Sequence, residues 1–582
     1  MRRPQTTSLG LALACLFAGS AHGQTIYPID RAEILVGTRF DFKVEFPGAP
    51  AEAAVRVTIN GEPLTSVLGK NASFVEHEDG ADHSALWIRD AVLARPGRYV
   101  VEAASGGRQS RVAWEVFDTP AATAKNVILF IGDGLSVAHR TAARILSKGL
   151  VEGRYGGELA IDDMPYMALV STSGTDSVVT DSANSMSAYT TGHKSCVNAL
   201  GVYCALNRNS LDHPKVEIIS EFIKRTRGMS VGSVTNTEIE DATPAGMVAH
   251  TRRRSDYNEI VDMFFHVQPE VMMGGGSPNF LPRSTPGSKR ADDIDYIKKF
   301  EDAGYRLVST RAELNAASGA TKLLGLFNEE NIDGALDRFF LKKGTVSRFP
   351  DQPDLTEQVR VSLDILSKND KGFVLMVESG RIDKYSHSLD WERAVYDTIM
   401  LDNAVKVAKD FAAPRNDTLI IVVADHAHPV SLIGTYDDER PGRELRDKLG
   451  VTQNSKVPNY PPPNAAGYPE RVDVSRRLAF VFGAFPDYCD LGHPYLDKEN
   501  VPTVQDPARR AYVANEAYCN MPGAARRTGN LPLDVGVGVH AADDVVLTAS
   551  GPGAELFHGR IDNTRVFRIM ATALGLGAEA KR

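Results

Sequence analysis

The sequence predicts an α/β protein with a mostly parallel central sheet covered by helices on both faces, preceded by a small all-β, immunoglobulin-like sandwich. Three apolar runs, at residues 126–131, 373–377 and 419–424, are typical of interior strands buried on both faces of a parallel sheet. Residues 25–116 instead alternate apolar and polar residues between Asn-Gly and Pro-Gly turns, which predicts antiparallel strands. The 582 residues are too many for one compact core.

The composition is that of a folded protein, and its acidic balance argues against a diffuse nucleic-acid-binding surface. Apolar residues make up 43% of the chain and charged residues 24%, which argues against disorder. The formal net charge of -9 makes a nucleic-acid-binding surface unexpected. After the N-terminus no apolar run approaches the roughly 20 residues that cross a bilayer, so we expect no membrane span in the mature chain.

The N-terminus has the composition of a secretory signal peptide. Residues 1–23 carry Arg2 and Arg3, then an apolar run at 9–18, then small residues before Gln24. The apolar run is about half of what a membrane anchor needs. A lipoprotein modified at Cys15 is less favoured, because only five apolar residues would precede it. We therefore expect an exported protein, periplasmic or secreted.

Cleavage of that segment leaves four cysteines. They are Cys196, Cys204, Cys489 and Cys519. An even number in an oxidising compartment predicts two disulfides. Three pairings exist, and closeness in sequence favours Cys196 with Cys204 and Cys489 with Cys519. The absence of a CxxC motif argues against a cysteine zinc site.

The remaining chain divides into an accessory domain at 24–118 and a larger domain at 119–582. The accessory sandwich holds no cluster of catalytic residue types, so we favour a shielding scaffold over a binding or positioning module. Between His426 and His540 lie 113 residues rich in Pro, Asn and Gly, too many for a plain loop. This stretch predicts an insertion at about 429–535, at the mouth of the site, that contains the second cysteine pair.

Each of the three buried runs is followed by an acidic residue. Asp133, Glu378 and Asp425 stand where the strands end. Ligands of open α/β sheets collect beyond the carboxyl ends of the strands. Three carboxylates gathered there repel one another unless cations neutralise them. The sequence therefore predicts an acidic rim that binds metal.

Imidazoles accompany these carboxylates. Asp383 and His387 are four residues apart, so one helical turn places them on the same face. Asp425 and His426 are adjacent, and His540 follows the insertion. Carboxylate and imidazole are zinc ligands. Taken singly, each pair is more readily explained as a surface salt bridge or a polar turn, and only together with Asp133, Glu378 and His540 do the pairs indicate metal.

A serine precedes a predicted helix. Residues 184–191 predict a helix that ends at Gly192, with Thr180, Asp181 or Ser182 as its N-cap. Backbone amides and the helix dipole stabilise an anion at such a position. Ser182 is therefore a candidate nucleophile as well as a candidate cap.

Oxygen ligands and arginines follow at 238–254. Asp241 and Thr243 offer hard oxygens suited to magnesium, and Pro244 starts a predicted helix. Arg254 stands about three helical turns further on, and a guanidinium can hold two phosphate oxygens. Arg252 and Arg253 fit a solvated helix end better, although spacing alone does not decide which arginine points inward.

Taken together, these residues resemble the alkaline phosphatases, most closely the bacterial subtype with two zinc ions and one magnesium ion. The resemblance runs from about 126 to 574, without much of the insertion and without the sandwich. It rests on six blocks in order: 126–134, 180–183, 241–245, 377–383 with His387, 424–428, and His540 followed by 551–554. Leu135, Ser379 and Ala541 depart from the family pattern, and none of them removes a ligand.

The resemblance implies three metal sites per chain, two for Zn²⁺ and one for Mg²⁺. The ligands of the first zinc would be Asp383, His387 and His540. Those of the second would be Asp133, Ser182, Asp425 and His426. Magnesium would contact Asp133, Thr243 and Glu378, with Asp241 acting through water. Asp241 and Lys384, where a histidine could stand, favour magnesium over a third zinc.

The resemblance also implies roles for four other groups. Arg254 would hold phosphate and be oriented by Asp181, Lys384 would reach phosphate through water, and His428 would contact a ligand side chain. Ser182 would attack phosphorus and form a phosphoserine, so that small phosphate monoesters are substrates and inorganic phosphate is a product. The family resemblance makes a homodimer possible.

Two rival functions stay open at this stage. One is a phosphodiesterase with the same metals, which would need room for a second ester group near Arg254. The other is a non-catalytic exported metal-binding or adhesion protein, in which the sandwich matters most. A sulfatase fits less well, because the chain has no Cys-x-Pro-x-Arg or Ser-x-Pro-x-Arg stretch.

Overall fold

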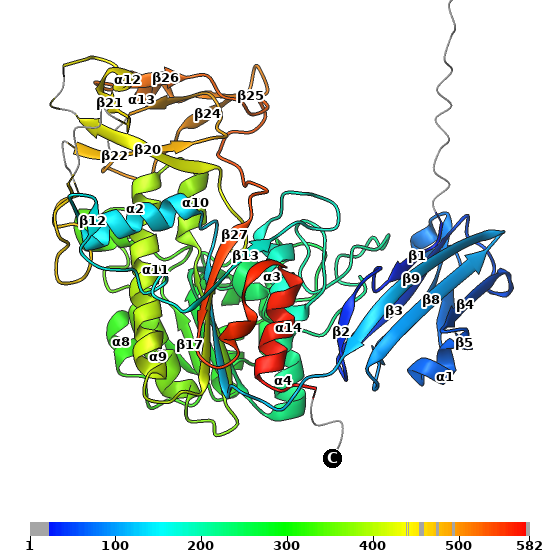
Figure 1. Cartoon of the computed structure of the whole chain (residues 1–582). Coiled ribbons are helices and arrows are strands. Elements are labelled where there is room, and N and C mark those ends of the chain that lie inside the picture. The colour runs from blue at the N-terminus through cyan, green and yellow to red at the C-terminus, as the bar shows by residue number, and fades with distance from the viewer. Residues whose placement is uncertain are drawn as a thin grey trace, which may run out of the picture.

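The structure is a computed structural model that describes residues 23–437, 439, 441–452, 459–472, 476–491 and 495–577. The expected signal peptide lies, except for Gly23, outside the described residues. Figure 1 shows a small all-β part (blue) beside a large α/β part, as the predicted fold class requires.

Two sheets form the N-terminal part. The first has the order β1-β3-β7-β6, with β1 Thr25–Tyr27, β3 Arg39–Pro47, β7 His83–Val92 and β6 Ser73–Val75. The second has the order β2-β9-β8-β4-β5, with β2 Glu33–Leu35, β9 Arg108–Phe117, β8 Gly97–Ser105, β4 Val55–Ile59 and β5 Glu62–Pro63. Both sheets contribute to one buried core, which includes Phe42 and Trp114. The prediction of antiparallel pairing holds except at β2, which pairs with β9 in parallel.

A ten-stranded sheet forms the centre of the larger domain. Seven neighbouring strands run parallel: β16 Arg306–Val308, β17 Leu323–Leu326, β15 Val271–Gly275, β14 Ser230–Glu238, β18 Phe373–Ser379, β10 Asn126–Gly132 and β19 Thr418–Val423. Beyond β19 come β27 Val545–Ser550, which is antiparallel to both its neighbours, then β13 Tyr166–Ser171 and β28 Gly559–Asp562. The three apolar runs are β10, β18 and β19, and they are buried throughout.

Helices cover both faces of this sheet (Figure 1). One face carries α2 Val137–Lys148, α8 Arg311–Asn315, α9 Leu355–Leu366 and α11 Trp391–Ala412. The other carries α3 Ser182–Thr191, α4 Ile219–Arg227 and α14 Thr564–Ala573. Shorter helices are α1 Leu64–Leu68, α5 Ala242–Ala245, α7 Tyr296–Asp302 and α10 Arg381–His387, and α6 spans Tyr257–Val267. Among the helices that the structure describes, none has the length and apolar character to cross a membrane.

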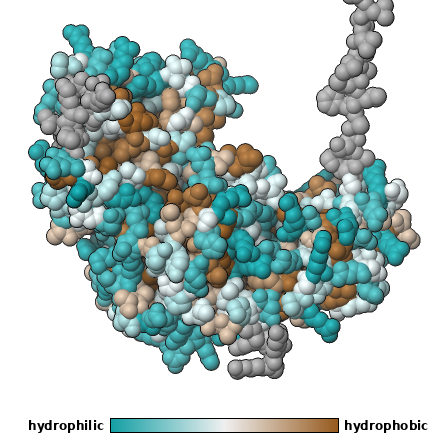
Figure 2. Space-filling view, viewed as in Figure 1, coloured by the Kyte–Doolittle hydropathy of each residue, from teal (hydrophilic) through white to brown (hydrophobic). Residues whose placement is uncertain are grey.

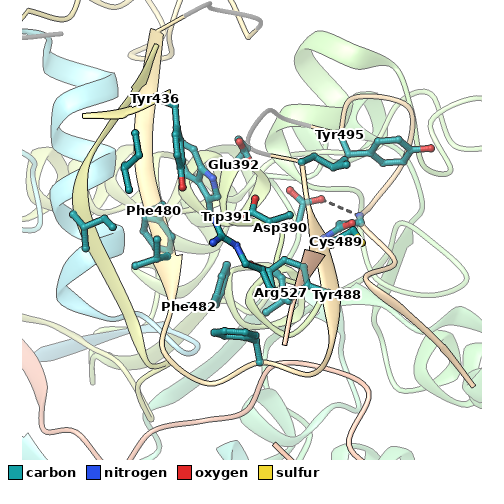
Figure 3. A pocket seen from close by; sticks show the side chains of 18 residues that line it. Asp390, Trp391, Glu392, Tyr436, Phe480, Phe482, Tyr488, Cys489, Tyr495 and Arg527 are labelled. Atoms are coloured by element: carbon teal, nitrogen blue, oxygen red, sulfur yellow. Dashed lines mark hydrogen bonds and ion pairs between the residues drawn. The ribbon is translucent and has the colours of Figure 1, made fainter. Parts of the chain in front are cut away.

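Three small sheets lie between residues 430 and 527, within the stretch predicted as an insertion. They are β20 Val430–Asp437 with β21 Leu449–Gly450 and β22 Arg476–Phe482, β23 Tyr488–Asp490 with β26 Ala525–Arg527, and β24 Thr503–Asp506 with β25 Ala511–Ala514. Figure 2 shows hydrophobic residues gathered beneath these sheets. A pocket of about 270 Å³ lies there, with Trp391 and Phe480 stacked in its wall (Figure 3).

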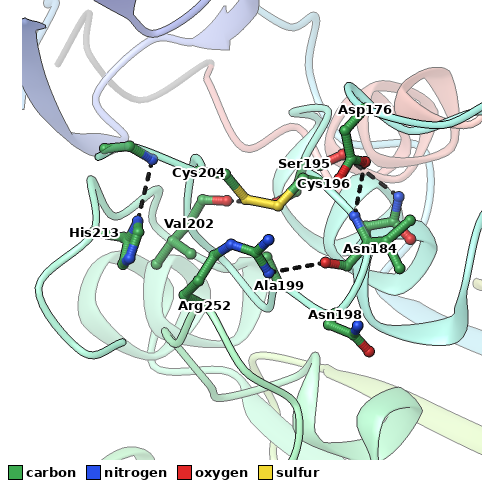
Figure 4. Close-up of a disulfide and its surroundings, with 12 residues drawn as sticks. Asp176, Asn184, Ser195, Cys196, Asn198, Ala199, Val202, Cys204, His213 and Arg252 are labelled. Carbon is green, nitrogen blue, oxygen red and sulfur yellow. Dashed lines mark hydrogen bonds between the residues drawn. A yellow bond between two sulfur atoms is a disulfide. The ribbon is translucent and has the colours of Figure 1, made fainter. Parts of the chain in front are cut away.

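Both disulfides join the cysteines that are close in sequence. Cys489 on β23 is bonded to Cys519, the last residue of helix α13 Glu516–Cys519. Cys196 is bonded to Cys204 in the loop that follows α3 (Figure 4). The favoured connectivity is therefore confirmed.

Candidate active site

Strand order places three carboxylates at one edge of the sheet. β18, β10 and β19 are direct neighbours and parallel, so their carboxyl ends coincide. Asp133 follows β10, Glu378 ends β18 and Asp425 follows β19, and all three are at least 98% buried. The backbone N–H of Gly134 donates to Asp425 Oδ1 over 3.1 Å, which ties two strand ends together.

Three histidines converge on Asp383. Asp383 and His387 lie one turn apart on α10, and His387 Nε2 is 3.3 Å from Asp383 Oδ1. His540 Nε2 is 3.4 Å and His428 Nε2 2.7 Å from the same oxygen. Nδ1 of His387 contacts the carbonyl of Gly538 at 2.6 Å, and Nδ1 of His540 that of Thr180 at 2.9 Å. These backbone contacts fix the tautomer that leaves Nε2 free to bind a cation.

A second group surrounds the serine. Ser182 is the first residue of α3, and Asp181 is its N-cap, because the Asp181 carboxylate accepts from Asn184 N at 3.2 Å. Ser182 Oγ lies 3.5 Å from Asp133 Oδ1 and 3.3 Å from His426 Nε2. His426 Nε2 is in turn 3.1 Å from Asp133 Oδ1. The structure thus brings the predicted nucleophile against the predicted ligands.

A third group lies around Glu378. Its carboxylate accepts hydrogen bonds from the hydroxyls of Thr235 and Thr237 on β14. Asp241 caps α5 by accepting from Ala242 N at 2.8 Å. Thr243 Oγ1 is buried and has no hydrogen-bond partner among the described residues. Thr235 and Thr237 were not predicted from the sequence. Their spacing of two residues, which places both side chains on one face of a strand, was the available signal.

The helix expected from Pro244 to Arg254 is not formed. α5 is a single turn that ends at Ala245, with Gly246 as its C-cap, and Arg254 lies outside it. Arg254 is held instead by its backbone N–H, which donates to the carbonyl of Asn198 at 2.9 Å. Asn198 N also donates to the Asp181 carboxylate at 3.2 Å. Asn198 was not predicted, because no local pattern marks a loop residue whose partners are distant in sequence.

Arginine and lysine charges meet at Asp241. The guanidinium of Arg254 donates to Asp241 Oδ1 at 2.7 Å and to Asp181 Oδ2 at 3.2 Å. Lys384 Nζ lies 2.8 Å from Asp241 Oδ2. Burial would raise the pKa of Asp241, but the charges of Lys384 and Arg254 outweigh it and hold that pKa below its ordinary value. Asp241 therefore holds both side chains, and Arg254 also contacts Asp181, the residue before the serine.

Burial and mutual repulsion raise the pKa values of the three carboxylates at the strand ends. Burial, then repulsion from Asp383, Asp425 and Glu378, raises the pKa of Asp133 well above its ordinary value. Burial, then Asp241, raises the pKa of Glu378 to about 7. The pKa of Asp425 is also raised, and its Oδ2 has no hydrogen-bond partner in the described chain. Divalent cations would keep these groups ionised, and the donor sets fit zinc and magnesium.

Known proteins share this fold and sequence. Residues 124–576 match the family model for alkaline phosphatase. The tissue-nonspecific alkaline phosphatase of Gallus gallus is 31% identical over 78% of this chain and 85% of its own length. The alkaline phosphatase of Escherichia coli (strain K12) is 32% identical over 55% and 73%, respectively.

Solved structures agree. The alkaline phosphatase of Thermus thermophilus has a TM-score of 0.56 at 25% identity, covering 79% of this chain and 93% of that one. The alkaline phosphatase of the Antarctic bacterium TAB5 shares the fold, with a TM-score of 0.53 at 19% identity, over 78% of this chain and 99% of that one. Because the family model spans more than half of the sequence, the chain belongs to the alkaline phosphatase family and is a metal-dependent phosphatase.

Proposed function

We propose that this chain is an exported enzyme that hydrolyses phosphate monoesters through a phosphoserine on Ser182. The observation that carries the proposal is the position of Ser182 Oγ. It lies at the N-terminus of the ten-residue helix α3, within 3.5 Å of both Asp133 and His426. Arg254 stands on the other side of Asp181, the residue that caps the same helix.

The three groups of side chains would hold the cations. Asp383, His387 and His540 would hold one Zn²⁺. Asp133, Asp425, His426 and the Ser182 oxygen would hold the second. Mg²⁺ would contact Asp133, Thr243 and Glu378, with Asp241 beyond a water molecule. When bound, these ions would acidify the serine hydroxyl and water and offset negative charge on the phosphoryl group.

The chain's own residues supply attack and orientation. Ser182 Oγ attacks phosphorus, the alcohol leaves on the opposite side, and water then releases inorganic phosphate from the phosphoserine. The amides and dipole of α3 stabilise negative charge on that oxygen. Arg254 has five N–H donors, of which two contact Asp181 and Asp241, so others remain for phosphate oxygens. Lys384 adds positive charge from the side of Asp241.

Export and assembly complete the proposal. Two disulfides fit an oxidising compartment, periplasmic or extracellular. A homodimer would be tested by sedimentation of the purified mature chain.

The direct test is Ser182→Ala, with Ser255→Ala as the matched control on an exposed serine next to Arg254. Turnover of p-nitrophenyl phosphate should fall by about 10³-fold or more in Ser182→Ala and stay near wild type in Ser255→Ala. Circular dichroism and metal content report on folding and the metal centre. Comparable turnover in Ser182→Ala would refute the nucleophile.

Comparing a monoester with a bis-aryl diester tests the phosphodiesterase alternative, which needs space that Arg254 occupies.

A further inference from the structure

A basic pocket lies beside Arg254, on the far side of the loop that holds it. Its volume is about 310 Å³, and its lining includes Arg208, Arg252, Arg253, Asn207 and His213 but no acidic residue. Arg252 stands two residues from Arg254, so their Cα atoms are at most about 7 Å apart. The guanidinium of Arg252 donates to the carbonyl of Val197 at 2.9 Å, next to the Asn198 that contacts Asp181 and Arg254.

Figure 4 shows this arrangement at the disulfide-bridged loop. Arg252 lies between His213 on one side and Asn198 on the other. Residues 197–198 therefore link Arg252, in the lining of the pocket, to the groups that hold the proposed phosphate site.

The arginines leave positive charge in the pocket. Arg253 pairs with Asp256 at 3.0 Å. Arg208 is exposed, and among the described residues none makes a hydrogen bond or ion pair to its guanidinium. Its backbone N–H is held by Asp79 of the sandwich at 2.9 Å, and nearby Asp212 is paired with Arg89. The carboxylates of Asp256 and Asp79 stand against three guanidinium groups, so the site keeps a net positive charge, which attracts anions.

Asn207 presents a hydrogen-bond donor that lacks an acceptor. Its side chain is 92% buried. Lys43 Nζ of the sandwich donates to Asn207 Oδ1 at 2.7 Å, which fixes the orientation of the amide. Nδ2 is then left without any hydrogen-bond partner in the described chain. A buried donor without an acceptor is costly, and an anionic ligand would satisfy it.

His213 supplies a further donor. Ala205 N–H donates to His213 Nδ1 at 3.1 Å, so the neutral ring carries its proton on Nε2. Burial, followed by the charges of Arg252 and Lys43, lowers the pKa of His213 to about 4. The imidazole thus stays neutral at pH 7, in surroundings that are already positive.

We propose that this pocket binds a second anionic group of the substrate, a phosphate or a carboxylate at the end opposite the scissile phosphate monoester. The proposal rests on the proposed function and narrows it to substrates with two anionic ends. The donors of Asn207 and His213 and the guanidinium groups of Arg208 and Arg252 would contact its oxygens, and Arg253 in the same lining would add positive charge. A small neutral or aromatic leaving group would leave the pocket unused.

The test compares α,ω-alkanediol bisphosphates of four to eight carbons with the matching monoalkyl phosphates. At the best length, kcat/KM for the bisphosphate should exceed that for the monophosphate by about tenfold, mainly through KM. Arg208→Gln/Arg253→Gln should remove most of this advantage and leave kcat/KM for p-nitrophenyl phosphate within about twofold of wild type. Arg98→Gln/Arg111→Gln, which removes two exposed charges from the sandwich, should keep the advantage.

A binding experiment separates failure of the pocket from failure of the proposed function. In Ser182→Ala, calorimetry with alkane bisphosphonates and monophosphonates should show the same preference, and Asn207→Asp should abolish it by placing a carboxylate in the pocket. No preference at any length, or a preference kept in both pocket variants, would overturn the proposal. A third outcome would also overturn it. Sulfate would change p-nitrophenyl phosphate turnover in wild type but not in the pocket variants, and bisphosphates would show no advantage. A free anion, not a second group of the substrate, would then occupy the pocket. If wild type showed no turnover but still preferred bisphosphonates, the proposed phosphatase activity would be refuted and the anion-binding pocket supported.

Discussion

At the scale of single residues, Arg254 is placed by two carboxylates and one carbonyl. It donates to Asp181 and Asp241, and its backbone N–H contacts Asn198. Lysine has one point of charge and cannot keep both carboxylates while holding two phosphate oxygens. In the proposed function, the geometry of this one side chain would decide how phosphate is oriented.

The first prediction concerns Arg254→Lys. We expect kcat/KM for p-nitrophenyl phosphate to fall about 100-fold, because preorganised donors to the transition state are lost. Inhibition by inorganic phosphate should weaken in parallel. Arg283→Lys, at an exposed arginine paired with Asp293, is the control and should behave as wild type. A decrease of less than about threefold in Arg254→Lys would contradict the role.

The second prediction uses the pKa of Glu378, which rises from an ordinary 4.5 to about 7 in the folded chain without cations. The folded state then binds the proton more tightly than the unfolded state. The contribution of Glu378 protonation to the free energy of unfolding is complete below pH 4.5 and is lost as pH rises towards 7. In chelator-treated protein, wild type should lose stability relative to Glu378→Gln across this window.

The measurement is the difference in Tm between the two proteins from pH 4.5 to pH 7. Taking the difference cancels the buried histidines, whose lowered pKa values act in the opposite direction. Glu301→Gln, at an exposed glutamate, changes the same charge and should show a difference that hardly varies with pH. A relative gain for wild type as pH rises would have the wrong sign and refute the assignment.

The candidate site residues could be named from the sequence because most of them end a recognisable strand or begin a helix. Asp133, Glu378 and Asp425 follow buried runs, and Ser182 opens α3. Asn198 and Asn207 were not predictable. Each lies in a loop whose position depends on partners far away in the sequence, Arg254 for one and Lys43 for the other.

At the scale of elements, three strand assignments followed from apolar runs, whereas the helix after Pro244 did not form. β10, β18 and β19 are buried on both faces, so their runs carry a strong signal. The segment after α5 has no such apolar run, and its conformation depends on tertiary contacts. Thr251 forms a β-bridge with Leu200 of the disulfide-bridged loop. That loop therefore controls where Arg254 stands.

The third prediction tests the loop. Cys196→Ser/Cys204→Ser should lower the free energy of unfolding by ~2–3 kcal/mol, the loop entropy of a short ring. It should also lower kcat/KM for p-nitrophenyl phosphate, because Asn198 contacts Asp181 and Arg254. The Cys489–Cys519 disulfide closes a longer ring in the insertion. Cys489→Ser/Cys519→Ser should therefore lower the free energy of unfolding by ~4 kcal/mol while leaving kcat/KM within about threefold. Equal losses of activity in the two variants would show that the first loop has no special link to the site.

At the scale of the whole molecule, the sandwich does more than cover the larger domain. Its strand β3 alternates apolar and polar residues, a pattern that says nothing about what covers the polar face. In the structure Asp41, Lys43 and Glu45 on that face are all buried. Residues 203–216 of the larger domain cover them, so contacts between the domains, invisible to local patterns, decide the burial.

Lys43 is the centre of this junction. Its ammonium group lies 2.6 Å from Glu45, 2.7 Å from Glu78 and 2.7 Å from Asn207, and its side chain is fully buried. Tyr27 of the sandwich donates to the carbonyl of Cys204 at 2.9 Å, at the end of the disulfide-bridged loop. The sandwich thus contacts the same segment that lines the basic pocket and adjoins the site. This contact favours a positioning role over the shielding scaffold expected from the sequence.

The last prediction therefore concerns Lys43→Met. Removing one partner of a buried ionic cluster leaves the charges of Glu45 and Glu78 without their ammonium partner, which should lower the free energy of unfolding by about 3–5 kcal/mol. Asn207 also loses the donor that fixes its amide, so hydrogen exchange at residues 203–216 should accelerate more than in the central sheet. Lys371→Met, at an exposed lysine, should change stability by less than about 0.5 kcal/mol. A Lys43→Met chain as stable as that control, with unchanged exchange at 203–216, would mean that the two domains fold and act independently.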